Sequence, residues 1–241
     1  MDPLTIAAAS GMRARMESLE LLANNLANAG TSGYKADREF YNLYADEAVA
    51  AGPLPAMLPV IESHWTDFAQ GTLKATGNPL DLALSGDGFF AADAPSGVVY
   101  TRNGSFRLSR EGALVTAEGY RLRGRDGRPI QVDPGRPFEV TREGAVMQGG
   151  QLIGNLEILD FDRGALNKAG GNYFRLSAPD ARSRVSPAEV LQGHSESANF
   201  AAAETAVRLV SVMRQFEMLQ RAMVLGGEMS RRAVEEVARA S

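Results

Sequence analysis

Residues 23–35 read Ala-Asn-Asn-Leu-Ala-Asn-Ala-Gly-Thr-Ser-Gly-Tyr-Lys, and this stretch carries more information than any other in the chain. Its three asparagines are poor helix formers. Asparagines in a helix favour a polar face that is matched by other polar groups, for instance in a packed assembly. Gly30 and Gly33 are suitable places for such a helix to end. The stretch therefore predicts the end of an N-terminal helix whose polar face contacts other polar groups.

The residues before this stretch have the pattern of a coiled-coil helix. Asp2 is suited to the N-cap and Pro3 to the first helical position. Apolar positions at alternating spacings of three and four form a seam, which consists of Ala9, Met12, Met16, Leu19, Ala23 and Leu26.

The C-terminal part of the chain has a second seam with the same spacing. It consists of Ala202, Ala206, Leu209, Met213, Phe216, Gln220 and Met223. Gly226 and Gly227 predict that this helix weakens or ends there, with one more short helical stretch over residues 229–240. The two helices are expected to pair with each other or with neighbouring subunits. A helical hairpin that closes an ordinary globular fold is the plainer alternative.

The residues between the two helices have the texture of β-structure. Gly52–Pro55 and Pro59 mark a linker. From Phe68 onward, short apolar runs alternate with turn pairs such as Asn103-Gly104, at a spacing of about eight residues. The segments expected to form strands are 80–84, 106–108, 152–161 and 173–176.

The fold class predicted is therefore α+β, with N- and C-terminal helices forming a coiled-coil-like terminal domain around a mainly antiparallel β middle domain. The predicted boundaries are 1–34 for the N-terminal helix, 35–66 for an extended linker, 67–190 for the β domain and 191–241 for the C-terminal helix.

Composition excludes several classes of protein. The 241 residues carry a net charge of -4 with both signs interspersed, so no nucleic-acid partner is expected. The absence of cysteine excludes disulfides and cysteine-bound zinc. No apolar run approaches the roughly eighteen residues of a membrane-spanning helix, so no membrane insertion is expected. The N-terminus lacks the charge and apolar length of a cleaved signal peptide, so the protein, if it leaves the cytoplasm, is expected to keep its N-terminus.

No motif predicts catalysis, a cofactor or a metal site. His64 and His194 lie outside any recognised catalytic or zinc motif. Residues 86–91 fit the dinucleotide pattern Gly-x-Gly-x-x-Ala, but a turn follows where a helix should receive the pyrophosphate. Asp160 and Asp162 resemble the start of a calcium loop, but the required glutamate is missing. We expect a glycine bend at the first site and a polar turn at the second.

Three stretches together resemble a known family. Residues 23–35 match the N-terminal motif of flagellar rod and hook proteins, Ala-Asn-Asn-Leu-Ala-Asn-x-x-Thr-x-Gly-Tyr/Phe-Lys. Residues 71–90 are similar to the central signature of that family, and residues 100–106 continue it. Gly193, Glu196 and Asn199 resemble the block that precedes the C-terminal helix, although Ala198 replaces the usual serine. The resemblance covers nearly the whole chain.

The resemblance implies a structural subunit of the flagellar basal-body rod and no enzyme, small-molecule substrate or cofactor. It implies export by the flagellar type III apparatus and assembly with itself and other rod proteins across the periplasm, where the rod transmits torque. Terminal helices would form the inner tube, and a short amphipathic helix that is marginal alone would fold as it assembles. The chain length and residues 79–90 favour a proximal-rod member; a distal-rod member is the alternative.

The resemblance and the two seams together give the predicted assembly interface. Its residues are Met12, Met16, Leu19, Ala23, Asn24, Asn25, Leu26, Asn28, Gly33, Tyr34, Glu196, Asn199, Leu209, Met213, Phe216 and Met223. Two rival hypotheses come from other classes. One is an extracytoplasmic β-rich module that binds glycan or cell wall, although Trp65 is the only tryptophan. The other is a carboxylate-based hydrolase, for which no acidic pair can be placed.

Overall fold

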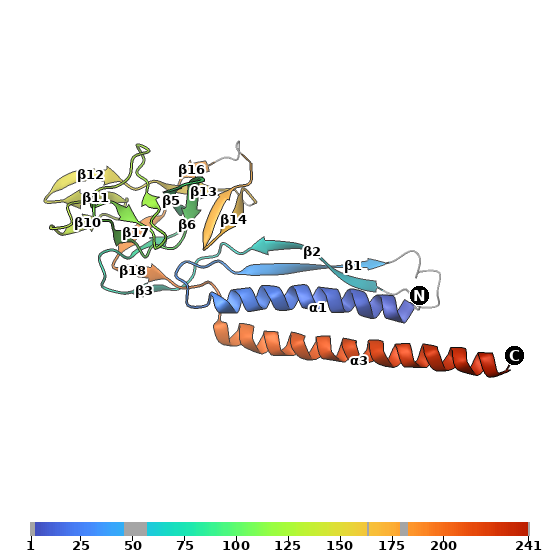
Figure 1. Ribbon diagram of the computed structural model, residues 1–241. Coiled ribbons are helices and arrows are strands. Elements are labelled where there is room, and N and C mark those ends of the chain that lie inside the picture. The colour runs from blue at the N-terminus through green and yellow to red at the C-terminus, as the bar shows by residue number, and fades with distance from the viewer. Residues whose placement is uncertain (1–2, 46–56, 163, 179–182, 241) are drawn as a thin grey trace. The chain divides into compact units, whose positions relative to one another are not determined.

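The computed structural model describes residues 3–45, 57–162, 164–178 and 183–240 (Figure 1). The chain forms two compact units. The first unit consists of Met1–Asn28, Ala36–Asp67 and Ala201–Ser241, and the second of Ala29–Lys35 and Phe68–Phe200. Helices at both ends and antiparallel strands between them confirm the α+β class.

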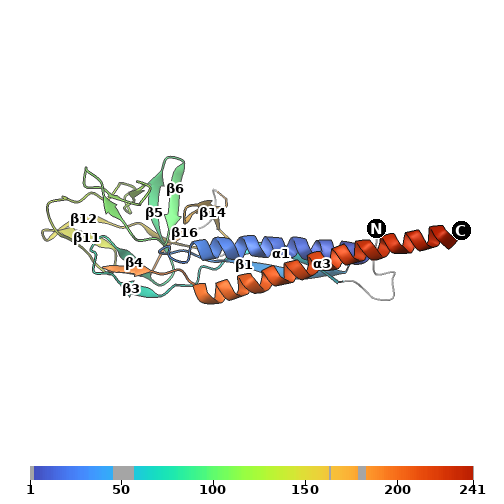
Figure 2. The same ribbon diagram turned by 60° about the horizontal axis from the view of Figure 1, so that its bottom comes forward.

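Two helices and one β-hairpin make up the first unit. Helix α1 (Pro3–Ala27) begins at the predicted proline, whose fixed φ suits a first helical position. It runs antiparallel beside helix α3 (Ala202–Ala240), as Figures 1 and 2 both show. Strands β1 (Asp37–Ala45) and β2 (Met57–Thr66) pair along their whole described length and pack on α1.

The buried stripe of α3 differs by one position from the predicted seam at three places, Thr205, Val212 and Leu219. Its less exposed residues alternate at spacings of four and three: Thr205, Leu209, Val212, Phe216, Leu219, Met223 and Gly226. Val212 and Leu219 take the places predicted for Met213 and Gln220, which are exposed. The helix carries apolar residues at adjacent positions such as 212 and 213, so two overlapping seams fit its sequence, and the α1 partner selects one of them.

Helix α1 buries a narrower and more polar stripe than its sequence predicts. The buried residues are Gly11, Ala14, Ser18, Leu22 and Asn25. By contrast Met16 is half exposed and Ala23 is exposed. Contacts on two sides explain this choice, because α3 and the β-hairpin both approach α1 and small side chains let them come close.

Three predicted boundaries are wrong. Helix α3 continues through Gly226 and Gly227, because a glycine costs a helix only about 1 kcal/mol relative to alanine and good helix formers surround the pair. The predicted extended linker contains β1 and β2, with Pro59 tolerated in the two-stranded hairpin. Strands continue past 190 to Glu196, so the C-terminal helix starts at Ala202 and not at 191. Asp2 and Gly52–Pro55 lie outside the described residues.

The second unit contains all the remaining strands. Its largest sheet follows the order β14-β15-β6-β5-β9-β8-β7, with β13 pairing with both β5 and β16. A three-stranded sheet β10-β11-β12 and two pairs, β17-β4 and β18-β3, complete the unit. The strand bounds are β3 Leu73–Ala75, β4 Leu82–Ser85, β5 Phe89–Ala94, β6 Gly97–Thr101, β7 Arg107–Leu108, β8 Leu114–Val115, β9 Arg121–Leu122, β10 Phe138–Val140, β11 Ala145–Gln148, β12 Gln151–Asn155, β13 Ile158–Phe161, β14 Leu166–Gly170, β15 Tyr173–Leu176, β16 Ser183–Val185, β17 Glu189–Gln192 and β18 His194–Glu196.

Apolar clusters hold the second unit together. The main cluster joins strands from both halves of the unit and includes Phe90, Leu114, Leu122, Val146, Leu156 and Val190. Phe90 packs edge-on against Phe106, with ring centroids 5.3 Å apart. A second cluster of aromatic residues surrounds Phe89 and Phe174. Residues 82–84 of the predicted strand are all buried, as expected for a strand covered on both faces.

The glycine-rich residues 86–88 form a bend between two strands. Strand β4 ends at Ser85 and β5 begins at Phe89, so a strand follows the glycines where a dinucleotide site needs a helix. Gly88 has a φ of 146°, and a Cβ there would crowd the side chain of Ser186. The predicted glycine bend is confirmed.

Candidate functional site

The informative stretch of residues 23–35 divides between the two units. Its helical part is the last turn of α1 and lies in the first unit. Residues 29–35 lie in the second unit, and we call them the strap. Hydrogen bonds fix the strap along its length. Gly33 donates its backbone N–H to the carbonyl of Glu196 at 2.7 Å, and Asn172 donates a side-chain N–H to the carbonyl of Ser32 at 2.8 Å.

Gly33 is required by the path of the strap. Its φ of 65° lies in the left-handed region, which side chains with a Cβ adopt at a cost. A Cβ at this position would also overlap the backbone of Arg102 and Asn103. Gly33 was predicted at an assembly interface, but its immediate surroundings are the second unit of its own chain.

Three charged side chains, those of Lys35 in the strap, Arg102 and Glu196, contact one another. The Lys35 ammonium donates to Glu196 Oε1 at 2.6 Å and to the carbonyl of Ala69 at 2.7 Å. Arg102 approaches the other oxygen of Glu196 at 3.4 Å and donates to the carbonyl of Gly86 at 2.8 Å. The N–H of Gly71 donates to Glu196 Oε1 at 2.8 Å. The side chains of Lys35 and Glu196 are 0% exposed.

Burial and the neighbouring carboxylate have opposite effects on the pKa of Arg102. Burial lowers the pKa of the Arg102 guanidinium, and the charge of Glu196 opposes that shift. Arg102 also lies over the ring of Phe89, at 5.3 Å from its centroid. A single carboxylate therefore serves two buried cations, and its loss leaves both without their main counter-charge.

Tyr34 completes the anchoring of the strap. Its ring is buried, with the Lys168 ammonium 4.7 Å from the ring centroid and Phe200 packed edge-on. The Lys168 ammonium also donates to the carbonyl of Lys35 at 2.9 Å. Asn199 donates its side-chain N–H to the carbonyl of Ala69 at 3.2 Å.

The asparagines of α1 have local partners in the first unit. Asn25 is buried and pairs with the backbone of Asp37 twice, donating to its carbonyl at 2.9 Å and accepting from its N–H at 3.1 Å. The amide therefore imitates a strand neighbour at the start of β1. Asn28 donates to the carbonyl of Asn24 at 2.9 Å and so satisfies one of the last carbonyls of α1.

Glu39 connects three elements of the first unit. It lies on β1, accepts a hydrogen bond from Ser18 of α1 at 3.0 Å and forms an ion pair with Arg208 of α3. Nothing in the sequence around Glu39 singled it out, because its partners are 21 and 169 residues away.

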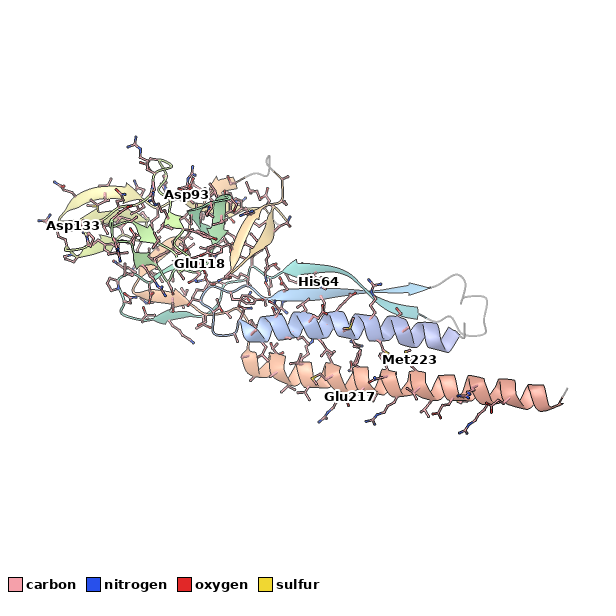
Figure 3. All side chains as sticks on the ribbon, in the orientation of Figure 1. His64, Asp93, Glu118, Asp133, Glu217 and Met223 are labelled. Atoms are coloured by element: carbon pink, nitrogen blue, oxygen red, sulfur yellow. The ribbon has the colours of Figure 1, made fainter. Side chains whose placement is uncertain are left out.

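Helix α3 exposes a second apolar surface beside its buried stripe. Val207 is 72% exposed, and several further large apolar side chains of α3 are exposed as well: Val210, Met213, Met218, Val224, Leu225 and Met229. An open groove along the helix is lined by Ala206, Val207, Val210, Ser211, Arg214, Gln215 and Met218. Figure 3 shows Glu217 on the side of α3 that faces away from α1.

The predicted interface residues fall into three groups. Gly33, Tyr34 and Glu196 are buried in the second unit, and Asn25 is buried in the first. Partly exposed residues of the helices and of the block after β18 form the second group: Met12, Leu19, Leu26, Asn28, Asn199, Leu209, Phe216 and Met223. Met16, Ala23, Asn24 and Met213 are exposed. Sequence reasoning left Lys35 and Arg102 out of the site, although both belong to the motifs it used.

The residues weighed for chemistry are dispersed. His64 is exposed on β2 (Figure 3), and His194 on β18 has its Nδ1 2.9 Å from the carbonyl of Gln192. Asp160 pairs with Arg184 at 2.6 Å. Across the described ranges, no group of three or more histidine, aspartate or glutamate side chains is placed to hold a metal ion. None of the described helices combines the length and apolarity needed to cross a membrane.

Two family models match the parts of the chain that form this arrangement. Residues 7–35 match the "Flagella basal body rod protein" family, and residues 83–148 match the "Flagellar hook protein FlgE/F/G D1 domain". The first match covers α1 and the strap, and the second covers β strands of the second unit. Both matched families consist of flagellar rod or hook proteins.

Similar proteins narrow the class. The chain is 32% identical over 219 residues to "Flagellar basal-body rod protein FlgF" of Mesorhizobium japonicum, which covers 90% of this chain and 89% of the relative. It is 33% identical over 225 residues to the FlgF of Caulobacter vibrioides, with 91% of each covered. A "Flagellar basal-body rod protein FlgG" of the latter organism is 30% identical over 238 residues, or 88% of this chain and 90% of the relative. The chain belongs to the flagellar basal-body rod protein family, and it is a structural subunit of the rod.

Proposed function

We propose that this rod subunit polymerises through its two terminal helices, with the exposed apolar surface of α3 as the main contact between subunits. The observation that carries the proposal is the exposure of large apolar side chains along α3, while the opposite side of that helix packs on α1. Contiguous exposed apolar surface on a folded protein marks an interaction site. Packing against helices of neighbouring rod proteins would remove this surface from water.

The partly exposed residues of α1 extend the proposed contact. Met16 is 50% exposed, and Ala23 and Asn24 are exposed beside it. Met12, Leu19 and Leu26 of the predicted seam remain partly exposed. The buried residues Asn25, Gly33, Tyr34 and Glu196 act differently in this proposal: they shape the subunit and do not touch its neighbours.

We further propose that the subunit belongs to the proximal rod. The alignment with the FlgF of Mesorhizobium japonicum spans 219 residues at 90% coverage of this chain, which leaves almost no room for insertions. The alignment with the FlgG of Caulobacter vibrioides spans 238 residues at 88% coverage, so it contains inserted residues that this chain lacks. This difference agrees with the expectation that distal-rod members are longer.

The proposed role in the cell is structural. The subunit would be exported by the flagellar type III apparatus, assemble with itself and other rod proteins, and transmit torque. Most of the stability of a helix in a protein comes from packing of its apolar face, so burial of the incompletely covered seams against neighbours supports folding during assembly.

Site-specific labelling tests the proposed contact, and the absence of cysteine from the chain makes it clean. Val210→Cys should react with a bulky maleimide in the dilute purified chain and should be protected in isolated basal bodies. The same variant labelled as a monomer is the control for reactivity. Equal labelling of Val207→Cys, Val210→Cys and Val224→Cys in the two preparations would show that α3 contacts no neighbour.

A further inference from the structure

The chain passes between the two units four times, after residues 28, 35, 67 and 200. The passages involve three segments of the second unit: the strap, the residues that follow Asp67, and the residues that precede Ala201. The buried charged side chains described above lie within or contact all three. Lys35 belongs to the strap, its ammonium contacts the carbonyl of Ala69, and Glu196 begins the last segment.

We propose that Lys35, Glu196 and Arg102 form a buried ionic joint, which holds the three connecting segments together inside the second unit and so fixes where the chain leaves it. Each segment is bonded to the others through Glu196 or its neighbours. Glu196 binds the strap through Lys35 and Gly33, and it binds the second segment through the N–H of Gly71.

Backbone hydrogen bonds join the same segments around the ion pairs. Ser197 donates its N–H to the carbonyl of Thr72 at 2.9 Å, and Asn199 donates its N–H to the carbonyl of Tyr34 at 3.4 Å. A Cβ at Gly71 would overlap the carbonyl of Ser197, so these two segments touch at their backbones. Loss of the central carboxylate would therefore loosen a set of short contacts and not a single bond.

The energetics favour a positioning role over a purely stabilising one. Enclosing three charges requires several kcal/mol of desolvation, and apolar residues of similar size often stabilise such a site as well or better. Ion pairs constrain geometry more than apolar contacts do, because Lys35 and Arg102 must both lie within reach of the one Glu196 carboxylate. The second unit also has a large apolar core that does not include these side chains. The joint thus sets geometry where the core supplies stability.

Amide-resolved hydrogen exchange on the full-length purified chain tests the joint. Lys35→Met removes one cation, keeps most of the side-chain volume and leaves Glu196 paired with Arg102, so the buried charge is balanced. The amides of Gly33, Gly71 and Asn199 should then exchange about ten- to a hundredfold faster, the effect of losing a buried hydrogen bond to a charged group. The core amides of Leu114, Ile130 and Val132, which donate to backbone carbonyls, should keep their protection.

Two further variants make the result decisive. Leu114→Ala opens a cavity in the apolar core. It should accelerate exchange of the core amides and leave the amides around the joint less affected. Lys168→Met removes the bond from the exposed Lys168 side chain to the carbonyl of Lys35, together with the ammonium over the Tyr34 ring, and it should accelerate the Gly33 amide less than Lys35→Met does. Unchanged protection of Gly33, Gly71 and Asn199 in Lys35→Met would overturn the proposal. Equal acceleration of these amides and the core amides would overturn it too. The measurement reads the isolated chain, so its outcome is independent of whether α3 contacts neighbouring subunits.

Discussion

The two units of this rod protein treat apolar and polar side chains in opposite ways. In the second unit, phenylalanine, leucine and valine side chains fill continuous clusters, and even three charged side chains are enclosed and paired. In the described part of the first unit, few apolar residues are buried, and they do not form such clusters. They are Ala14, Leu22, Ala36 and Val212. Several large apolar residues of α3, among them Val207, Met218 and Met229, are exposed.

This difference suggests that the second unit can fold by itself, whereas the first unit depends on contacts with neighbouring subunits. Burial of a large apolar side chain contributes about 1.5–3 kcal/mol, so the second unit has the material to fold alone. In the first unit, much of this contribution would be gained only when other helices cover α3, as proposed above. We therefore expect substitutions in the second unit to act on the stability of the chain, and substitutions in the first to act on assembly.

The largest effect on stability is expected from Phe90→Ala. Phe90 is 0% exposed and packs on Phe106, so its truncation should destabilise the second unit by about 3–5 kcal/mol. Urea unfolding followed by near-ultraviolet circular dichroism measures this. Met213→Ala on the exposed side of α3 is the matched control and should change the unfolding free energy of the dilute chain very little. A loss below about 1 kcal/mol for Phe90→Ala would contradict the division of roles.

Leu26→Asp is expected to block assembly without affecting the second unit. Leu26 is only partly buried in the single chain, but a charge there would be enclosed in the proposed helical interface at a cost of about 3–5 kcal/mol for each subunit. Cells should form no complete rod and should not swim, while the purified variant keeps the unfolding transition of its β unit. Leu26→Met preserves apolar volume and should assemble nearly normally. Normal numbers of flagella in the Leu26→Asp strain would refute the role given to this residue.

A pair of glycine substitutions sharpens the comparison at the strap. Gly33→Ala combines a left-handed φ with overlap on the backbone of Arg102, so we expect a loss of about 2–4 kcal/mol. Gly77→Ala has a similar φ of 72° but open space around it, so the loss should be about 1 kcal/mol. Thermal unfolding of the two purified variants gives the difference. Equal losses would mean that the strap yields easily to the extra methyl group.

The smallest expected effect comes from Gly227→Ala. Gly227 lies within α3 with no atom near the position of a Cβ, so alanine should stabilise the helix by about 0.5–1 kcal/mol. Far-ultraviolet circular dichroism of the dilute chain should show more helix, whereas unfolding of the β unit should not change. A drop in helical signal would contradict the open space around Gly227 in the single chain.

The sequence predicted the order of elements better than their limits. Terminal seams and turn glycines are local signals, so the helices and the β middle were found. Two features were missed for physical reasons. Residues 37–45 and 57–66 pair and pack on α1, and no local sequence pattern indicates that contact. The step from Met213 to Val212 in the buried stripe depends on which side of α3 its partner takes.

The candidate site shows the same limit more strongly. Glu196 and Gly33 were chosen from motifs, but the motifs give no information about whether a residue faces a neighbour or the interior. Glu196 is an ion whose side chain is fully buried, a situation that composition never favours, since charges are rarely buried unless paired. Its partners are 94 and 161 residues distant, so only the folded chain brings them together.

The distance along the chain between Lys35 and Glu196 also sets the order in which the protein is completed. The strap belongs near the N-terminus, yet its counter-ion is made 161 residues later. A chain that emerges N-terminus first, from a ribosome or from a secretion channel, must therefore release most of its length before the strap can be sealed. Contacts of such long separation form slowly, because loop closure has to precede them. The closing of the strap is thus a late event for a chain that emerges in this direction, because it has to wait until Glu196 has emerged.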